Sequence, residues 1–251
     1  MSASPMREQM SSHYRKLLGL LFAAALGAVT MVGCGGDDPV APPPDLGSSS
    51  VTFLHVNPGR DAAVAFFRMD SIQVGSGATA TPQYAGFFKA TVPNGTNLKY
   101  TAKATSGQPL ASGTGSHDSS KIATVVYAGD ALLHEIFVAS TTRIEPGAGN
   151  VAIRFIHAAK DAGARILKAN SANGTTISTQ SYKGASGSYV TIPATTTSIW
   201  IVDTATTNPK APIEVPAGNL SAATSWSVVF FGTENPVQPS LAWTGQLIAD
   251  E

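Results

Sequence analysis

The sequence predicts an all-β protein made of two tandem antiparallel β-sandwich domains, Ig-like or transthyretin-like in type. Three observations predict this fold. Short runs of β-branched and aromatic residues alternate between two faces, as in Ile199–Val202 and Trp226–Phe230. Turn residues bound such runs every ~8–12 residues, which is the spacing of a sandwich. After residue 33, no segment sustains the 3.6-residue period of a helix.

Residues 1–33 are predicted to be a secretory signal. Three basic residues stand against one acidic residue among the first 16, and residues 17–32 then carry no charge. A basic start followed by a short apolar run is typical of a signal peptide. The apolar run of 16 residues is shorter than the ~20 that a membrane-spanning helix needs. We therefore expect the protein to be exported.

Cys34 is the only cysteine, and it closes the run Met31-Val32-Gly33-Cys34, which resembles the lipobox of bacterial lipoproteins. The resemblance implies signal cleavage between Gly33 and Cys34 and lipidation of the Cys34 sulfur. Two or more acyl chains anchor a protein stably, since each buried CH₂ contributes ~0.8 kcal/mol. The expected partner is thus the membrane, and the expected location is the bacterial cell envelope. An uncleaved membrane helix and an ordinary signal peptide are the alternatives.

The residue after the cysteine bears on which membrane holds the anchor. Gly35 stands there in place of Asp. By resemblance to lipoprotein sorting rules, this favours the outer membrane or the cell surface over the inner membrane. Residues 34–50 are rich in Pro, Gly, Ser and Asp, and we expect a disordered tether that reaches at most ~55 Å. A leader with no spacing role is the alternative.

The rest of the chain is predicted to be two copies of one unit, residues 51–146 and 147–251. Three landmarks recur in the same order at offsets of 98 to 103 residues. The pairs are Phe53-Leu54-His55 with Phe155-Ile156-His157, Tyr84 and Val92-Pro93 with Tyr182 and Ile192-Pro193, and Thr124–Tyr127 with Ser227–Phe230. A period near 100 residues indicates duplicated domains rather than a short-repeat solenoid.

The segment Arg154–Ala162, RFIHAAKDA, resembles the opening of the domain of unknown function 4397. That family starts with a strand ending in His, followed by Ala-Ser-Pro-Asp-Ala-Pro. His157, Ala158, Asp161 and Ala162 match this pattern, and the first copy matches less well because it carries a two-residue insertion. The resemblance implies exported bacterial β-sandwich proteins, often lipoproteins. It implies no activity, because the family has none established.

His55 and His157 each end a predicted strand, with Asp61 and Asp161 a few residues further on. We interpret these four residues as structural. Each Asp would bond turn amides and each His a nearby backbone group, so that the first loop of each copy is pinned. One His with one Asp offers too few ligands for a closed metal site and no third partner for a catalytic triad. We therefore predict no catalytic, cofactor-binding or metal-binding residue.

Composition excludes one class of partner. Without residues 1–33, the chain has 13 basic and 15 acidic residues, which gives a formal charge of −2. Nucleic-acid binding needs a clustered basic face, so we predict no nucleic-acid partner. Aromatic residues could form a sugar-stacking platform, although such residues more often fill a sandwich core. They are Trp200, Trp226, Trp243, Tyr84, Tyr182 and Tyr189.

These observations favour a non-enzymatic, lipid-anchored envelope protein that acts as a structural or binding module for a polysaccharide or another envelope protein. No nucleophile elbow, Walker loop or H-E-x-x-H motif occurs. One alternative is an envelope hydrolase that uses His55 or His157. Another is a carrier or sensor for a small ligand or glycan, bound in a groove between the two copies.

Overall fold

The computed structural model describes residues 47–58, 66–70, 72–74, 84–104, 106–130, 132–218, 220–236 and 238–250. The predicted signal peptide, the lipidation and cleavage residues Cys34 and Gly33, and the loop residue Asp61 lie outside the described residues. Across those ranges, no helix is long and apolar enough to cross a membrane. The described ranges all belong to one compact unit, Leu46–Glu251.

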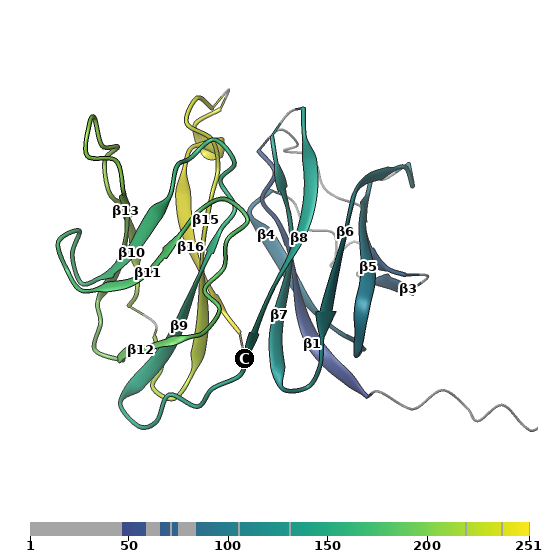
Figure 1. Ribbon diagram of the computed structural model, residues 1–251, viewed down its shortest axis with the longest axis horizontal. Helices are drawn as coiled ribbons and strands as arrows, with labels where there is room; N and C mark the ends of the chain where they lie inside the picture. The colour runs from purple at the N-terminus through teal and green to yellow at the C-terminus, as the bar shows by residue number, and fades with distance from the viewer. Residues whose placement is uncertain are drawn as a thin grey trace, which may run out of the picture. The chain divides into compact units, whose positions relative to one another are not determined.

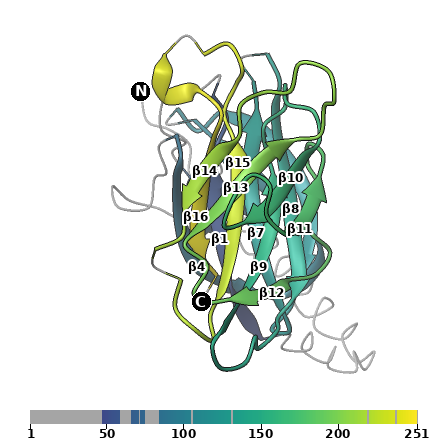
Figure 2. The ribbon, with the colours of Figure 1, turned by 90° about the vertical axis from the view of Figure 1, so that its left-hand side faces the viewer.

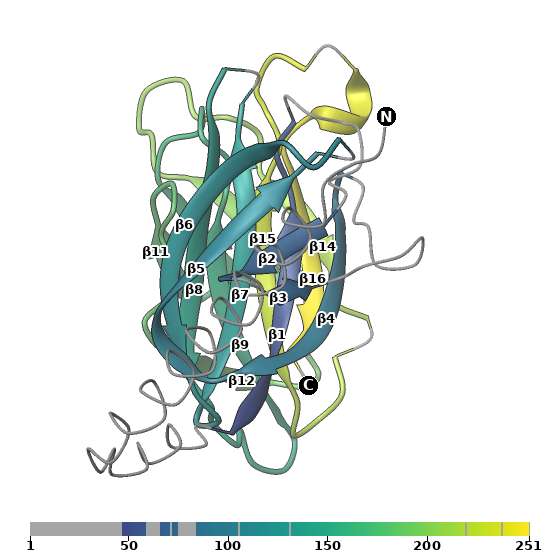
Figure 3. The same ribbon diagram turned by 90° about the vertical axis from the view of Figure 1, so that its right-hand side faces the viewer.

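The first sandwich consists of two four-stranded sheets within residues 48–142 (Figures 1 and 3). Sheet A has the order β4-β1-β7-β8, and its strands are β1 (Ser48–His55), β4 (Gly86–Pro93), β7 (Lys121–Gly129) and β8 (His134–Thr142). Sheet B has the order β3-β2-β5-β6, and its strands are β2 (Phe66–Met69), β3 (Ile72–Val74), β5 (Gly95–Lys103) and β6 (Pro109–His117).

The second sandwich, within residues 150–249, repeats this topology strand for strand (Figure 2). Sheet C has the order β12-β9-β15-β16, and its strands are β9 (Asn150–His157), β12 (Val190–Pro193), β15 (Ser225–Phe231) and β16 (Thr244–Ala249). Sheet D has the order β11-β10-β13-β14, and its strands are β10 (Arg165–Ala169), β11 (Thr176–Gln180), β13 (Ser198–Asp203) and β14 (Ile213–Pro216). A 3₁₀ turn, η1 (Pro239–Leu241), precedes β16.

The all-β sandwich prediction is confirmed, with two differences in detail. The central pairs β1·β7 and β9·β15 are parallel, whereas the sequence predicted antiparallel sheets throughout. A period of two tells which face a residue occupies but not which strand lies beside it. The first strand also begins within the predicted tether, because Ser48 to Ser50 pair with Thr91 to Pro93 of β4.

Each sandwich has its own apolar core between its two sheets. In the first sandwich, Val51 and Phe53 of β1 are fully buried against Tyr100 and Ala102 of β5. In the second sandwich, the equivalent positions of β9 face sheet D, whose core residues include Leu167. These side chains alternate along their strands, as the sequence pattern predicts.

A third cluster joins the two sandwiches, because sheet A and sheet C pack face to face (Figure 1). Ten buried residues form it: Leu54, Val56, Val126, Ala128, Ala139, Ile156, Ala158, Val229, Phe231 and Ile248. The four sheets are therefore stacked in the order B, A, C and D. One alternative interpretation of the sequence was a ligand-binding groove between the two copies. These buried side chains meet at the place where that groove would lie.

Arg154 on β9 is the largest fully buried side chain at this interface. Its Nε donates to Ser227 Oγ over 2.7 Å, and Nη2 donates to Thr124 Oγ1 over 2.7 Å. Its Nη1 reaches the carbonyl oxygens of Ile122 and Ala139, each at 3.2 Å. Asp250 Oδ1 lies 3.3 Å from Nη2 and neutralises the charge. The guanidinium thus bonds residues of both sandwiches.

Candidate functional site

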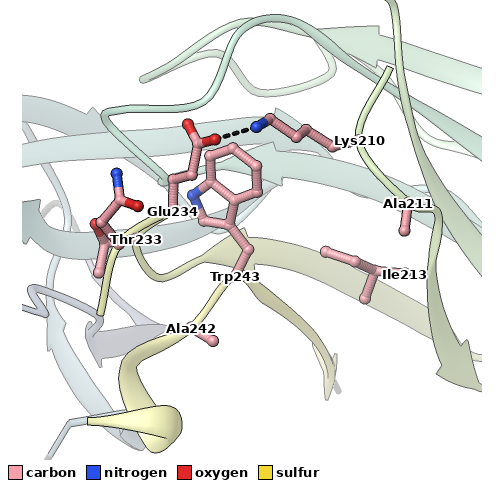
Figure 4. Close-up of a pocket in the computed structure, with 8 residues that line it drawn as sticks. Lys210, Ala211, Ile213, Thr233, Glu234, Ala242 and Trp243 are labelled. Carbon is pink, nitrogen blue, oxygen red and sulfur yellow. Dashed lines mark hydrogen bonds and ion pairs between the residues drawn. The ribbon is translucent and has the colours of Figure 1, made fainter. Parts of the chain in front are cut away.

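A pocket of about 400 Å³ opens at the end of the second sandwich where β15 ends (Figure 4). It lies between the β13–β14 and β15–β16 connections. Its lining residues are Lys210, Ala211 and Ile213 from the first of these regions, and Thr233, Glu234, Asn235, Ala242 and Trp243 from the second. The pocket therefore combines one large aromatic ring, small apolar side chains and several hydrogen-bonding groups.

Trp243 is fixed on three sides. The guanidinium carbon of Arg165 lies 4.9 Å from the indole centroid, and the Phe230 ring meets the indole at an angle of 61° with a centroid distance of 6.1 Å. The indole Nε1 donates to Asp161 Oδ1 over 2.8 Å. A cation over an aromatic face and a satisfied indole N–H both hold the ring in one orientation. The ring is half-buried and forms part of the pocket wall.

Asp161 organises the connection that carries Trp243. Its Oδ2 accepts a hydrogen bond from Thr233 Oγ1 at 2.6 Å and another from the Glu234 amide at 2.7 Å. The sequence placed Asp161 as a residue that pins its own loop. Its hydrogen bonds instead run to a segment more than 70 residues further along the chain. The long-range partner was not visible in the sequence because turn chemistry is read locally.

A buried ion pair supports the pocket from below. Arg165 Nη1 lies 2.7 Å from Asp203 Oδ1, and the two side chains are 4% and 8% exposed. Asp203 also accepts the amides of Ala205 and Lys210 at 3.0 and 3.1 Å. Burial alone would raise the pKa of Asp203, but the two amides and the Arg165 charge outweigh it, so this pKa lies below its usual range. Asp203 therefore stays ionised and fixes the Lys210 backbone.

Lys210 and Glu234 form an ion pair across the pocket (Figure 4). Their side chains are 50% and 35% exposed, so water reaches both. Charged groups of this kind can exchange their mutual contact for hydrogen bonds to a ligand at small cost, because an exposed ion pair contributes only ~0–1 kcal/mol. The polar side of the pocket is thus adaptable, while its aromatic side is rigid.

His157 lies under the same end of the second sandwich but makes only structural contacts in the pocket's neighbourhood. Its Nε2 lies 2.9 Å from the Gly163 carbonyl, to which it donates, and its ring packs on Phe230 at 5.0 Å. Burial lowers the pKa of His157, which the Gly163 bond opposes and the Arg165 charge reinforces. A buried, neutral ring whose Nε2 donates to a backbone carbonyl fits the structural interpretation of His157.

His55 of the first sandwich is also buried. Its Nδ1 accepts the Asn57 amide at 3.3 Å, and its ring packs on Tyr127 at a centroid distance of 5.0 Å. His134 contacts the Tyr127 hydroxyl at 2.9 Å, and His117 contacts the Tyr100 hydroxyl at 2.7 Å. Within the residues that the structure describes, no group of three or more His, Cys, Asp or Glu side chains is placed to hold a metal ion.

The six aromatic residues of the hypothesised platform are not brought together. Trp243 lines the pocket, whereas Trp226 packs against the core of the second sandwich and Tyr189 donates to Asp250 at the interface. Tyr84 and Tyr182 pack against the interface cluster, and the Trp200 indole donates to Ser198 on β13. The polar residues of the pocket were missed by sequence analysis. Their one signal is the length of the β15–β16 connection, which spans residues 232–243.

No protein-family model matches the chain, and no curated protein is significantly similar to it. Among solved structures, the chain is similar to CBMbc (family CBM26) from Eubacterium rectale Amy13K, solved in complex with maltoheptaose. The identity is 12%, the TM-score is 0.25, and the match covers 80% of this chain and 96% of that chain. Because this TM-score is low, the assignment of the fold rests on the sheet topology.

Proposed function

We propose that this protein is a non-enzymatic, lipid-anchored module of the bacterial cell envelope that binds a carbohydrate chain in the Trp243 pocket. The observation that carries the proposal is the fixed indole in the wall of a pocket with a polar rim. Small-molecule sites combine apolar or aromatic walls with a few polar groups that set orientation. A sugar ring matches such walls, because its C–H face packs on an indole while its hydroxyls bond carboxylate, ammonium and amide groups.

The rigidity of the aromatic wall supports binding rather than simple core packing. Asp161 holds Trp243 and the start of its connection, and Asp203 holds Arg165 beneath the ring. A group that is ordered before the ligand arrives costs little entropy on binding. The volume of about 400 Å³ is near the lower end of the ~300–1,000 Å³ range of ligand pockets, which suits one or two sugar units of a chain.

The position of the pocket suits display. β1 runs parallel to β7, and Asp130 after β7 contacts Lys160 after β9 at 2.7 Å, so these strands end at the same end of the molecule. β9 and β15 are also parallel, so the pocket lies at that end too. Ser48, where β1 begins, lies at the other end, one eight-residue strand or ~26 Å away. A module anchored through its N-terminal segment can thus present the pocket at its far end.

The binding proposal is tested with the full mature chain and a panel of soluble polysaccharides that includes starch, xylan, β-glucan and peptidoglycan fragments. Affinity electrophoresis followed by calorimetry would identify a binder. We expect Trp243→Ala to weaken binding at least tenfold. Trp200→Ala is the matched control, because Trp200 lies on sheet D outside the pocket lining. Equal binding by the Trp243→Ala protein, or no binding by the natural chain to any saccharide, would contradict the proposal.

The anchoring part of the proposal has a separate test. Mass spectrometry of the mature protein should find an N-terminal peptide that begins at Cys34 and carries a diacylglyceryl group. An unmodified Cys34, or a chain that still begins at Met1, would exclude the lipid anchor. That result would leave the pocket and its ligand unaffected.

A further inference from the structure

The interface between the two sandwiches is built from the same strand positions of each. Phe53 pairs with Val125 in sheet A as Phe155 pairs with Val228 in sheet C, which aligns β1 with β9 and β7 with β15. On this alignment, the ten buried residues of the interface form five equivalent pairs. These pairs are Leu54 with Ile156, Val56 with Ala158, Val126 with Val229, Ala128 with Phe231, and Ala139 with Ile248. The interface therefore has the form of a two-fold symmetric contact.

Such a contact does not by itself distinguish its partners. In a two-fold interface the same surface patch serves on both sides, so each patch is complementary to itself. The apolar pairs carry no charge that would oppose the packing of sheet C of one molecule on sheet C of a second molecule. Only a residue that differs between the two faces can select the native combination.

Arg154 is the charged difference between the two faces, whereas the pairs Ala128 with Phe231 and Ala139 with Ile248 differ only in the size of an apolar side chain. In sheet C it pairs in register with Ser227, and the equivalent pair in sheet A is Thr52 with Thr124. The Arg154 side chain bonds Ser227 of its own sheet and Thr124 of the facing sheet, which are equivalent positions. Arg154 therefore lies near the two-fold axis that relates the two faces. The interface holds a single guanidinium there, because Thr52 occupies the equivalent position of sheet A.

We propose that Arg154 makes sheet C a docking surface specific for a first-sandwich face, and that it excludes a second copy of sheet C. Two sheets C would bring two buried guanidiniums into the space that now holds one. Each Ser227 hydroxyl already accepts from its own Arg154 and donates to its own Asp250, and it would stand in place of the Thr124 hydroxyl that now accepts from Arg154. Each guanidinium would keep its own Asp250, but two guanidiniums crowded together out of water, without the Thr124 hydroxyl as acceptor, disfavour this pairing. The partner that fits is sheet A of a first sandwich, whose Thr124 hydroxyl and Ile122 and Ala139 carbonyls accept from Arg154.

The first test cuts the folded full chain at a protease site inserted between Gly147 and Gly149. Two preparations are cut, and one of them carries an affinity tag at the C-terminus of the second sandwich. They are mixed in mild denaturant, returned to buffer and captured on the tag. We expect the tagged second sandwich to retain an untagged first sandwich and no untagged second sandwich. Capture of untagged second sandwich, or loss of the first sandwich, would overturn the proposal.

The matched variant is Arg154→Met with Asp250→Asn, which removes both charges and nearly keeps the side-chain volumes. In the same exchange experiment, we expect this variant to capture second sandwiches as well as first ones. A variant that stays selective would overturn the role of Arg154. Circular dichroism of the uncut double variant is the check that its fold is retained.

A second test uses the uncut chain and adds the missing charge to sheet A. Thr52 is 3% exposed and lies in register with Thr124, so Thr52→Arg places a second guanidinium near the first. Thr52→Met adds comparable length without charge. We expect Thr52→Arg to lower the melting temperature more than Thr52→Met does, and we expect this difference to disappear in an Arg154→Met background. A difference that persists in that background would overturn the proposal.

Discussion

The two sandwiches share a topology but differ in the connection between their last two strands. In the first sandwich, four residues, 130–133, join β7 to β8. In the second, residues 232–243 join β15 to β16 and supply five of the eight residues that line the pocket. The duplication thus kept one scaffold and placed a candidate site on a single long connection. Binding residues commonly lie on loops that a rigid scaffold positions.

The sandwiches also differ below that connection. Arg165 pairs in register with Asp203 in the second sandwich. Aligning the core pairs Ala169–Ile199 and Met69–Tyr100 places Ala104 of the first sandwich at the position of Asp203. The first sandwich therefore has no carboxylate at the position from which Asp203 supports the Arg165 guanidinium beneath the Trp243 ring. The two sandwiches therefore differ more in their buried charged residues than in their apolar core residues. The following predictions test this distinction, from the largest expected effect to the smallest.

The largest effect is expected for Arg154→Ala. The substitution leaves Asp250, which is 7% exposed, without its cationic partner. Removing one member of a buried ion pair costs ~3–5 kcal/mol of the free energy of unfolding, because the other charge stays buried and uncompensated. Urea denaturation of the full chain measures this loss. Thr52→Ala, at the equivalent position of the first sandwich, should cost less than half as much, and equal costs would contradict the asymmetry.

The next effect is expected for His157→Ala. The ring is fully buried and donates to the Gly163 carbonyl, so its removal should leave a cavity and remove that hydrogen bond. We expect a loss of about 2–4 kcal/mol in the free energy of unfolding. His55→Ala is the matched variant in the first sandwich and should also destabilise the chain. Unchanged stability together with a lost ligand interaction would show that the structural interpretation of His157 is wrong.

The sequence predicted the fold of each sandwich but not the interface between the two sandwiches. The alternation of apolar and polar residues predicted the β class, because a strand with one solvent-exposed face has a period of two. The recurring landmarks predicted the duplication. The packing of sheet A on sheet C was not predicted. Its trace is the nearly continuous apolar run of β9, where Ala152 and Ile156 are as fully buried as Ile153 and Phe155. Such a run indicates a strand covered on both faces but does not name the covering element.

The candidate site was predictable only in part. Trp243 and Asp161 were both singled out, one as an aromatic that could stack on sugars and the other as a loop-pinning carboxylate. Their contact at 2.8 Å joins two loops that lie about 80 residues apart in the chain. Lys210 and Glu234 follow no pattern, because loop residues are placed by the elements that flank them rather than by a local period. Arg154 was hidden for a related reason, since its acceptors lie in both copies.

Asp161→Ala should have a smaller and local effect. It removes the acceptor of three hydrogen bonds that hold Thr233, Glu234 and Trp243. We expect about 1–3 kcal/mol of local destabilisation. Hydrogen exchange should be faster in the β15–β16 connection, with little change in the turn between β7 and β8. Uniformly faster exchange in both connections would show that Asp161 acts on the whole fold.

The dependence of the free energy of unfolding on pH should show the effect of one buried histidine in each sandwich. Burial is the main cause that lowers the pKa of His117 and of His157 below the usual value of ~6.5, although the Pro93 and Gly163 carbonyls oppose it. As pH falls below that value, the unfolded chain takes up protons that the folded chain does not, so the free energy of unfolding falls. We therefore expect the free energy of unfolding to fall between pH 7 and 5.5. The double variant His117→Gln, His157→Gln should flatten this slope in urea titrations, and an unchanged slope would assign it to other groups.

The smallest effect is expected at the edge of the interface. Lys160 contacts Asp130 across the two sandwiches at 2.7 Å, with side chains 31% and 43% exposed. Water screens such a pair, so Lys160→Ala should cost only about 0.2–1 kcal/mol, and 1 M salt should remove most of the difference. The contrast with Arg154 is the informative part, since both cations join the same two sandwiches. Urea denaturation measures the loss in the free energy of unfolding for both variants. If Lys160→Ala cost as much as Arg154→Ala, net attraction between the two sandwiches, rather than the buried position of Arg154, would hold them together.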